Sequence, residues 1–507
     1  MVVNDATPHD CAWRAEVDEL KAKVAERDEV IAKQSEMLEV FAGQLAALQQ
    51  KVFGGGQEKM PSPKDELRKG NRSKSGQPKR GDDKRKSNAA ARKKLPEREF
   101  VHRVRQEDKV ACTECGEPPT RQLGEGKVTT LYEFVPAHFE QHKHIRETLV
   151  CRCGSHIVTA DGPAKVIDKG RYGPGLMAHI ITGKCADSLP LYRIAKRYHR
   201  YGVPIARSTV GTLFHNSAEA IKPLYDLIFS HIAAQAVVQA DETPMAMQAK
   251  GKCRKGYLWT FLCDDAIGYR FAATRSGETP VVVLGGTQGT LVVDGYSGYN
   301  AVCTPQSRQR AGCLAHARRK FFEALKTAPM VAERAMGLIL EVYRVEHEMA
   351  EAGLTRSAQH GHERATRSRA AMAELRALID EEHDRHLAKG PMGKALTYAD
   401  NQWTELTRFI DDVEVPVDNN ASERALRIVA LGRKNFMFVG HVEAGQNLGV
   451  LYTMVANCEL HGVNPLAYLT DVLPRVQHTR ASKLSDLLPW NWKPPDPPKA
   501  SGANESE

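Results

Sequence analysis

The sequence predicts a multidomain protein that combines α-helical segments with one α/β domain. Three observations lead to this prediction: an N-terminal heptad pattern, two close pairs of cysteines, and short apolar runs that each end in an aspartate. A chain of 507 residues is long enough for roughly three or four domains. Because 42% of the residues are hydrophobic, the chain has enough apolar material for a sizeable core.

Residues 13–53 carry the heptad pattern of a coiled coil. The a positions are Val17, Val24, Ile31, Leu38, Leu45 and Val52, and the d positions are Leu20, Arg27, Gln34, Phe41 and Leu48. Mostly apolar a positions favour self-association through paired helices, each roughly 50 Å long. Arg27 and Gln34 weaken the middle of the seam. An amphipathic helix packed on its own protein is the alternative.

Residues 54–98 are predicted to form a disordered basic linker. Three glycines at 54–56 stop the preceding helix. From Lys59 to Arg98 there are 15 Lys or Arg against five Asp or Glu, with Pro, Ser and Gly between them. Such a composition cannot bury a core. Salt-dependent contact with DNA phosphate and a merely solvated linker are both compatible with it.

Residues 99–165 are predicted to form a small zinc-binding domain. Its candidate ligands are Cys112, Cys115, Cys151 and Cys153. Four thiols in two close pairs suit tetrahedral Zn²⁺ as a structural ion. The second pair is tighter than the usual Cys-x₂-Cys, and His156 is an alternative ligand to Cys153. Ordinary buried thiols are the remaining alternative.

Residues 166–222 are predicted to be helical and to contain a helix-turn-helix. One apolar face is formed by Leu191, Ile194, Ala195 and Tyr198. A turn follows at 201–204, and Ser208 is expected to cap a second short helix that runs through Phe214. Arg207, Ser208 and Thr209 start this second helix and are candidate DNA contacts. A helical hairpin without a role in DNA binding shows the same pattern.

From residue 230 to 445 the pattern becomes that of an α/β domain. Asp241 and Asp294 each end an apolar run, at 236–241 and 290–294. Further strands are expected at 257–263 and 267–274, joined as a hairpin, and 291–294 is expected to be the fourth strand. A basic helix is expected at 315–321, and residues from about 325 to 412 show helical patterns with charged faces. Glu423 is expected near the start of a later helix, with Arg424 and Arg427 on the same element.

Asp241, Asp294 and Glu423 suggest a site for divalent cations. An aspartate at the end of a buried strand lies at the sheet edge, where ligands and metals gather. The carboxylates of two such aspartates and of a glutamate on a helix can hold a pair of cations for in-line phosphoryl transfer. The alternative is that each aspartate only ends a strand and opens a turn.

At these residues the chain resembles the insertion sequence 66 family of bacterial transposases, over nearly its whole length. The resemblance rests on Gln239–Pro244, Val293–Tyr296, Cys313–Phe321 and Asp418–Arg427, followed by Gly432–Asn435. The segments His461–Pro465 and Leu488–Trp492 also look like this family. The family has the same order of coiled coil, zinc-binding segment, helix-turn-helix and ribonuclease-H-like catalytic core.

The resemblance implies that Asp241, Asp294 and Glu423 are the DDE triad and bind two Mg²⁺, or Mn²⁺. His316, Arg319 and Arg424 are possible supports of the site, and Arg318 and Lys320 are possible DNA contacts. One departure concerns the zinc site. The family usually has Cys-x₂-Cys at the second pair, and Gly154 stands here where the last cysteine would fall.

The resemblance also implies a function and partners. The protein is expected to bind the terminal inverted repeats of a bacterial element and to cut and join double-stranded DNA. It is expected to self-associate through its coiled coil, and small accessory proteins of the same element are possible partners. A catalytically inactive DNA-binding regulator derived from a transposase is the alternative.

Composition predicts a cytoplasmic, nucleoid-associated protein. The net charge of +9 favours a polyanionic partner. No signal peptide or membrane-spanning run is visible, so the 11 cysteines are expected to be thiols or metal ligands. The remaining segments are a C-terminal helical part at 446–493 and a disordered tail at 494–507.

Overall fold

The computed structural model describes residues 170–494, residues 164–167, two short strands near residue 150, and the single positions Glu19, Lys23, Arg27 and Phe139. The chain divides into two compact units. Of the described residues, the larger unit contains 164–167, 170–198 and 204–494 with Glu19, Lys23 and Arg27. The smaller unit contains Phe139, the two short strands and 199–203. In the smaller unit, β1 (Thr148–Val150) and β2 (Ile157–Thr159) pair antiparallel, with Val150 opposite Ile157.

A mixed sheet forms the centre of the larger unit. Its strands are β3 (Val237–Ala249), β4 (Lys252–Leu262), β5 (Ile267–Ala272), β6 (Gly289–Val292), β7 (Arg308–Ala311) and β8 (Phe438–Val439). The order is β5-β4-β3-β6-β7, and β8 also pairs with β3. β5, β4 and β3 are antiparallel, whereas β6, β7 and β8 join in parallel. Long crossover connections to β6 and β7 account for the parallel part.

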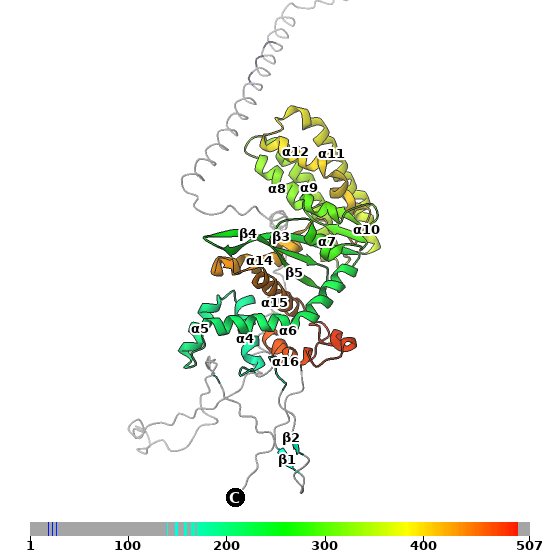
Figure 1. Ribbon diagram of the computed structural model, residues 1–507. Helices are drawn as coiled ribbons and strands as arrows, with labels where there is room; N and C mark the ends of the chain where they lie inside the picture. Colours follow the sequence, from blue (N-terminus) through cyan, green and yellow to red (C-terminus); the bar gives the residue numbers. More distant parts are fainter. Residues whose placement is uncertain are drawn as a thin grey trace, which may run out of the picture. The chain divides into compact units, whose positions relative to one another are not determined.

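Helices near both ends of the larger unit pack together on one side of this sheet (Figure 1). They are α4 (Pro174–Cys185), α6 (Arg207–Ala234), α15 (Val442–Leu460) and α16 (Pro465–Val476). α5 (Leu191–Arg200) precedes α6, and a 3₁₀ segment at Ala481–Leu487 follows α16. The interior of α15 is almost wholly buried, because it lies between β5 and the other helices.

α15 covers the outer edge of β5 with small and polar residues. Gly449 lies so close to β5 that an added Cβ would be 2.9 Å from the carbonyl oxygen of Tyr269. Thr453 Oγ1 accepts a hydrogen bond from the Tyr269 amide at 2.9 Å. The side-chain amide of Asn457 accepts from the Ile267 amide at 3.0 Å and donates to its carbonyl oxygen at 2.6 Å. Side chains of α15 thereby satisfy backbone hydrogen-bonding groups of Ile267 and Tyr269 at the edge of the sheet.

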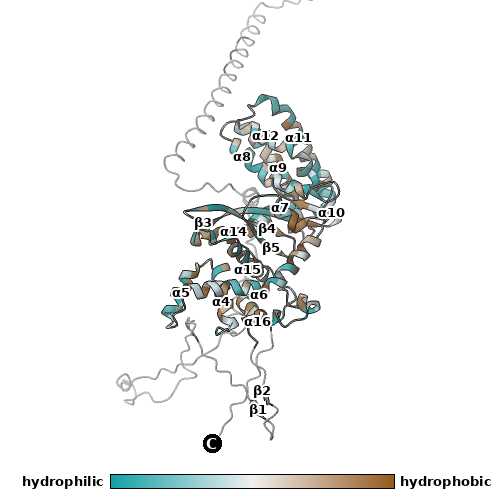
Figure 2. Cartoon of the chain, viewed as in Figure 1, coloured by the Kyte–Doolittle hydropathy of each residue, from teal (hydrophilic) through white to brown (hydrophobic). Residues whose placement is uncertain are grey.

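A helical region lies between β7 and α14 (Asn420–Phe436) in the sequence. In Figure 1 it is on the side of the sheet away from α4, α6, α15 and α16. Its helices are α8 (Leu314–Ala324), α9 (Pro329–Glu351), α10 (Ala358–Glu363), α11 (Arg369–Glu382), α12 (Pro391–Asn401) and α13 (Trp403–Thr407). Their buried residues, which include Ile339, Leu375 and Leu396, form one core with Val292 of β6 and Ala311 of β7. Figure 2 shows hydrophilic and hydrophobic residues alternating along these helices. The predicted helical character of residues 325–412 is confirmed.

The remaining elements lie next to the sheet. α7 (Glu278–Leu284) links β5 to β6, a 3₁₀ turn at Ser297–Ala301 follows β6, and α14 (Asn420–Phe436) leads to β8. Short 3₁₀ turns at His383–Arg385 and Arg408–Ile410 and a π turn at Arg364–Ser368 complete the helical region. Within the described residues no helix is long and apolar enough to cross a membrane.

The structure confirms some predicted elements and corrects others. The hairpin at 257–274, the basic helix after Cys313 and the helix start before Glu423 are present. Asp241 does not end its strand, because β3 continues for eight more residues paired to β4. The second helix after the 201–204 turn is not short but spans 28 residues, and its N-cap is Ala206 instead of Ser208. The coiled coil, the basic linker and most of the C-terminal tail lie outside the described residues, although Glu19, Lys23 and Arg27 are helical and exposed.

Candidate active site

Two neighbouring strands bring Asp241 and Asp294 to the same level of the sheet. β3 and β6 pair in parallel, with Gln239 opposite Val292. Asp241, within β3, and Asp294 each lie two residues beyond that pair, and Asp294 follows the end of β6 at Val292 instead of ending the strand as predicted. The amide of the next residue donates to Asp241 Oδ1 at 2.8 Å, and the amide two residues on donates to Asp294 Oδ1 at 2.9 Å. Each carboxylate is therefore oriented by the backbone that follows it.

The start of α14 brings Glu423 to the same place. Asn419, which is 1% exposed, donates from Nδ2 to the carbonyl oxygen of Ala240 at 2.7 Å. Its backbone amide donates to Cys313 Sγ at 3.2 Å. Glu423 follows in the first turn of the helix. Because the helix start is anchored beside Asp241, the third carboxylate joins Asp241 and Asp294.

The three carboxylates repel one another. Burial raises the pKa of Asp241 to about 7, and the charges of Glu242, Asp294 and Glu423 act in the same direction. A bound divalent cation would relieve this repulsion, because it supplies positive charge among the oxygens. Carboxylate oxygens are the hard ligands that Mg²⁺ and Mn²⁺ prefer. The donor set of this cluster therefore fits such a cation.

α8 adds basic groups beside Glu423. His316 Nε2 lies 3.9 Å from Glu423 Oε1, and one terminal nitrogen of Arg319 lies 3.4 Å from the same oxygen. Burial lowers the pKa of His316, and the Arg319 charge lowers it further. His316 Nδ1 is buried without a hydrogen-bond partner within the described part of the chain. The sequence prediction that His316 and Arg319 lie near the carboxylates agrees with this geometry.

The other predicted basic contacts differ in exposure. Arg318 is completely buried, and its charge lies close to the hydroxyl of Tyr343. The prediction that Arg318 contacts DNA is therefore wrong, because the side chain is not accessible. Lys320 is half-buried, with its ammonium group 5.1 Å from the ring centre of Tyr398. Arg424 is exposed at the start of α14. Successive helical residues point in directions about 100° apart, so adjacent basic residues have different surroundings.

A buried clamp next to Asp241 was missed in the sequence. The Glu242 side chain is 2% exposed. Arg275 Nε donates to Glu242 Oε1 at 2.6 Å, and the Tyr299 hydroxyl donates to Oε2 at 2.6 Å. The Arg275 guanidinium also lies 3.8 Å from the ring centre of Tyr296. The clamp joins β3 to the turn that follows Asp294, so it holds the two aspartate-bearing segments together.

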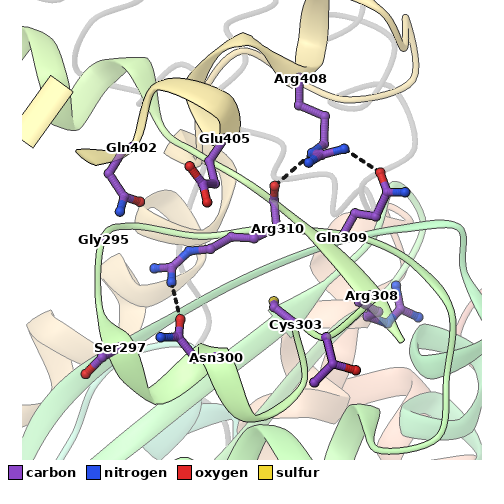
Figure 3. Close-up of a pocket in the computed structure, with 11 residues that line it drawn as sticks. Gly295, Ser297, Asn300, Cys303, Arg308, Gln309, Arg310, Gln402, Glu405 and Arg408 are labelled. Carbon is purple, nitrogen blue, oxygen red and sulfur yellow. Dashed lines mark hydrogen bonds between the residues drawn. The ribbon is translucent and has the colours of Figure 1, made fainter. Parts of the chain in front are cut away.

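A polar cavity of about 360 Å³ borders the turn after Asp294, and Gly295, Ser297 and Asn300 of this turn line it (Figure 3). Arg310 reaches across it and donates to Asn300 Oδ1 at 2.6 Å and to the carbonyl oxygen of Tyr296 at 3.0 Å. It also donates to the carbonyl oxygen of Asp294. Arg310 therefore fixes the backbone of this turn, and with it the position of the second carboxylate.

The candidate DNA contacts on α6 are on a separate element. Arg207, Ser208 and Thr209 form its first turn, and the first two are exposed. The candidate zinc ligands Cys112, Cys115, Cys151 and Cys153, and the alternative His156, lie outside the described residues. β1 and β2 flank the segment that contains the last three of these.

Three family models match this chain. The model of the Transposase IS66 family matches residues 169–447, which include all three carboxylates. The IS66 C-terminal element matches residues 453–490. The zinc-finger binding domain of transposase IS66 matches residues 110–154, which supports a structural zinc in this segment.

Relatives from one bacterium cover most of the chain. This chain is 35% identical over 406 residues to the uncharacterized protein y4jD of Sinorhizobium fredii (strain NBRC 101917 / NGR234). The matched region is 76% of this chain and 78% of the relative. This chain is also 30% identical over 428 residues to the uncharacterized protein y4hP of the same strain, and the matched region is 79% of this chain and 77% of the relative.

Proposed function

The chain belongs to the IS66 family of transposases, and from this premise we propose that it is the transposase of a bacterial insertion sequence. It binds the terminal inverted repeats of its element and catalyses metal-dependent cleavage and strand transfer of DNA. The observation that carries the proposal is the convergence of Asp241 from β3, Asp294 from the turn after β6, and Glu423 from α14. Three carboxylates in one cluster are the equipment for two-metal phosphoryl transfer.

The catalytic domain in this proposal is a ribonuclease-H-like core at 230–445 with a helical insertion at about 325–412. Its support is the mixed sheet, in which three antiparallel strands are continued by parallel ones. The first carboxylate belongs to β3, the second follows the end of the adjacent strand β6, and the third belongs to α14, which follows the helical region. The long separation in sequence between Asp294 and Glu423 is occupied by helices whose core includes Val292 of β6 and Ala311 of β7.

Asp241, Asp294 and Glu423 would hold two Mg²⁺ or Mn²⁺ ions. When bound, such ions lower the pKa of a water or a DNA 3′-hydroxyl and stabilise the oxygen that leaves. Asp241 must be ionised to act as a ligand, and its pKa of about 7 means that it loses its proton near neutral pH even without metal. The clamp of Glu242, Arg275 and Tyr299 keeps this carboxylate beside Asp294.

The basic residues around Glu423 have separate roles in this proposal. The Arg319 side chain is about half exposed, so its guanidinium can donate to a phosphate oxygen of the DNA strand at the site. His316 is mostly neutral at neutral pH, because burial lowers its pKa. Its Nε2 lies 3.9 Å from Glu423 Oε1, so it lines the site beside this carboxylate without adding a positive charge that would repel the metal ions. Arg424 contributes to DNA binding from the exposed side of α14.

Recognition and assembly use the rest of the chain. Cys112, Cys115, Cys151 and Cys153 would hold the structural Zn²⁺ in a domain at 99–165. Arg207, Ser208 and Thr209 would contact the element's ends through a helix-turn-helix within 166–222. A coiled coil at 13–53 would bring two copies together, so that both ends are processed in one complex. Phosphate contacts supply affinity in such an assembly, and base contacts supply specificity.

The test is a cleavage assay with the element's own ends. The purified protein is incubated with DNA that carries the terminal repeats flanking its gene, with Mg²⁺ or with EDTA, beside Asp241→Asn. We expect strand cleavage and joining that require both Mg²⁺ and Asp241. Binding without cleavage, also in the presence of the neighbouring gene products, would instead identify an inactive DNA-binding regulator.

A further inference from the structure

A long β-hairpin extends from the strand that carries Asp241. β5 pairs with β4 only from Tyr257 to Leu262, and β6 pairs with β3 only up to Gln239. Beyond these points the paired strands continue to a tip at residues 250–251. Along this extension β3 has only β8 as a neighbour on its other side, at Ala246 and Met247. Figure 1 shows β3 and β4 reaching past the rest of the sheet.

The tip of this hairpin is basic and exposed. It carries Lys250, Lys252, Arg254 and Lys255, and all four are exposed. The chain has no Asp or Glu from residue 243 to residue 263. None of the ion pairs among residues 170–494 includes any of these four side chains. The positive charge at the tip is therefore not neutralised by the surrounding protein.

α14 carries a second basic surface from the carboxylates toward the same hairpin. Arg424, Arg427 and Lys434 are exposed along it, and no Asp or Glu occurs from residue 424 to residue 442. The helix starts beside Ala240, and near its end Arg433 donates to Thr243 Oγ1 at 2.7 Å. β8 then pairs with the hairpin. The helix and the hairpin therefore run outward from the carboxylates as neighbours.

We call the seven exposed residues Arg424, Arg427, Lys434, Lys250, Lys252, Arg254 and Lys255 the basic track. Eight residues of β3 beyond Asp241 span about 26 Å at about 3.3 Å per residue. The 17 residues of α14 span about 25 Å. At about 3.4 Å per base pair, either element covers roughly seven base pairs of duplex DNA.

We propose that the basic track binds the phosphate backbone of duplex DNA on one side of the reacting phosphodiester, with the hairpin tip about seven base pairs away. This inference rests on the proposed function, and it adds a sequence-independent contact to those of the helix-turn-helix. Uncompensated lysines and arginines on a narrow ribbon suit a regular row of phosphates. The DNA major groove also admits a two-stranded β-ribbon, so the hairpin can follow the duplex without distortion.

The first test removes charge at the tip. A variant with Lys250, Lys252 and Lys255 each changed to Gln is compared with a control in which Lys326, Lys389 and Lys394 are changed to Gln. The control lysines are also exposed, but they lie in the helical region. Binding of a duplex that carries the element end is measured by fluorescence anisotropy over a range of salt concentrations in EDTA. Cleavage is absent under these conditions, so the result does not depend on catalysis.

We expect the tip variant to lose roughly tenfold in affinity near 0.1 M salt, and the slope of log K against log salt to fall by about two to three. The control is expected to keep the slope of the natural protein. Equal slopes for the tip variant and the natural protein would overturn the inference, and so would equal losses in both variants. Thermal melting of each variant excludes loss through misfolding.

The second test uses a cysteine that the hairpin already contains. Cys253 is exposed at the tip, whereas Cys185, Cys263, Cys313 and Cys458 are buried. A photo-crosslinking thiol reagent is attached, the protein is bound to the duplex, and the crosslinked nucleotide is mapped. We expect a crosslink about seven base pairs from the cleaved position that disappears in Cys253→Ser. Crosslinks that do not depend on Cys253 would contradict the proposal.

The two tests also separate failure of this inference from failure of the proposed function. If the natural protein neither prefers nor cuts the element end, the transposase assignment fails. If it binds and cuts the element end while the tip variant behaves like the control, only the basic track is wrong. If the tip binds an acidic protein instead of DNA, the tip variant keeps the salt slope of the natural protein and no crosslink depends on Cys253, which overturns the inference.

Discussion

The edge of the sheet under α15 and the carboxylate cluster under α14 are both places where a helix meets strands, and they are built in opposite ways. At β5, Thr453 and Asn457 satisfy the backbone groups of the edge strand, and Gly449 permits close contact. At the cluster, like charges are held together and burial raises the pKa of Asp241.

The difference shows where the stability of the domain comes from. Satisfied polar groups and close packing at β5 lower the free energy of the folded state. Repulsion among the carboxylates raises the free energy of the folded state. They stay together because Asn419, Arg310 and the Glu242 clamp fix their backbone. Changes at the first region should therefore alter folding, and changes at the second should alter activity without loss of stability.

The largest expected effect is on activity. Glu423→Gln keeps the shape of the side chain and removes a metal ligand, so we expect cleavage of the element end to slow by more than about 10³-fold, or roughly 4 kcal/mol. The melting temperature should be unchanged or higher. Glu443→Gln is the control, because Glu443 also lies in the first turn of a helix and is exposed. Equal cleavage rates in the two variants would remove the distinction between the regions.

A smaller effect, on folding, is expected from Gly449→Val. The new side chain would collide with the backbone of Tyr269, so we expect about 3 kcal/mol less stability in urea unfolding. Gly337→Val is the matched control, because Gly337 is also inside a helix and has no atom within 4 Å of an added Cβ. Similar losses in both variants would show that helix geometry, and not the contact with β5, sets the effect.

The pH dependence of stability sharpens the comparison further. The folded protein holds a proton on Asp241 up to a pH of about 7, whereas the unfolded chain loses it near pH 4. In EDTA, stability therefore falls as pH rises from about 4 to 7, because the folded state binds more protons over this range. We expect Asp241→Asn to be more stable than the natural protein by about 4 kcal/mol at pH 8, because the pKa differs by about three units, and equally stable near pH 4. A constant difference between the two across this range, measured by urea unfolding, would contradict the charge repulsion.

The smallest expected effect is from Thr453→Val. The change leaves the Tyr269 amide without its acceptor, which should cost about 1 kcal/mol in urea unfolding. Thr470→Val serves as the control, because the Thr470 hydroxyl only donates to a carbonyl oxygen of its own helix. No difference between the two variants would mean that the edge of β5 is satisfied in another way.

Local pattern predicted much of this fold. Alternation and β-branched residues indicated the β4–β5 hairpin, and apolar residues at helical spacing indicated the region after α8. The continuation of β3 was missed because Pro244 interrupts the pattern. Its pairing with β8 joins residues far apart in the sequence, and no local rule shows such a contact. The length of α6 was also missed, because Pro223 lies inside a helix that packing stabilises.

The candidate site was predictable only in part. Asp241, Asp294 and Glu423 were found because each stands at a recognisable place in its segment. The Glu242 clamp was missed because its partners Arg275 and Tyr299 come from other elements. Nothing local distinguishes Arg318 from Arg319, and burial of the first depends on α9 packing against α8. Contacts between side chains of different elements could therefore not be predicted from the sequence.

The most direct test of the account is the binding of Mn²⁺ to the protein without DNA. Calorimetric titration at pH 8 is carried out on the natural protein and on Asp241→Asn, Asp294→Asn and Glu423→Gln, each after confirmation that it is folded. One shared site predicts that every variant loses at least about tenfold in affinity for the same ions. Unchanged Mn²⁺ binding in any of the three variants would show that the carboxylates do not form one metal site.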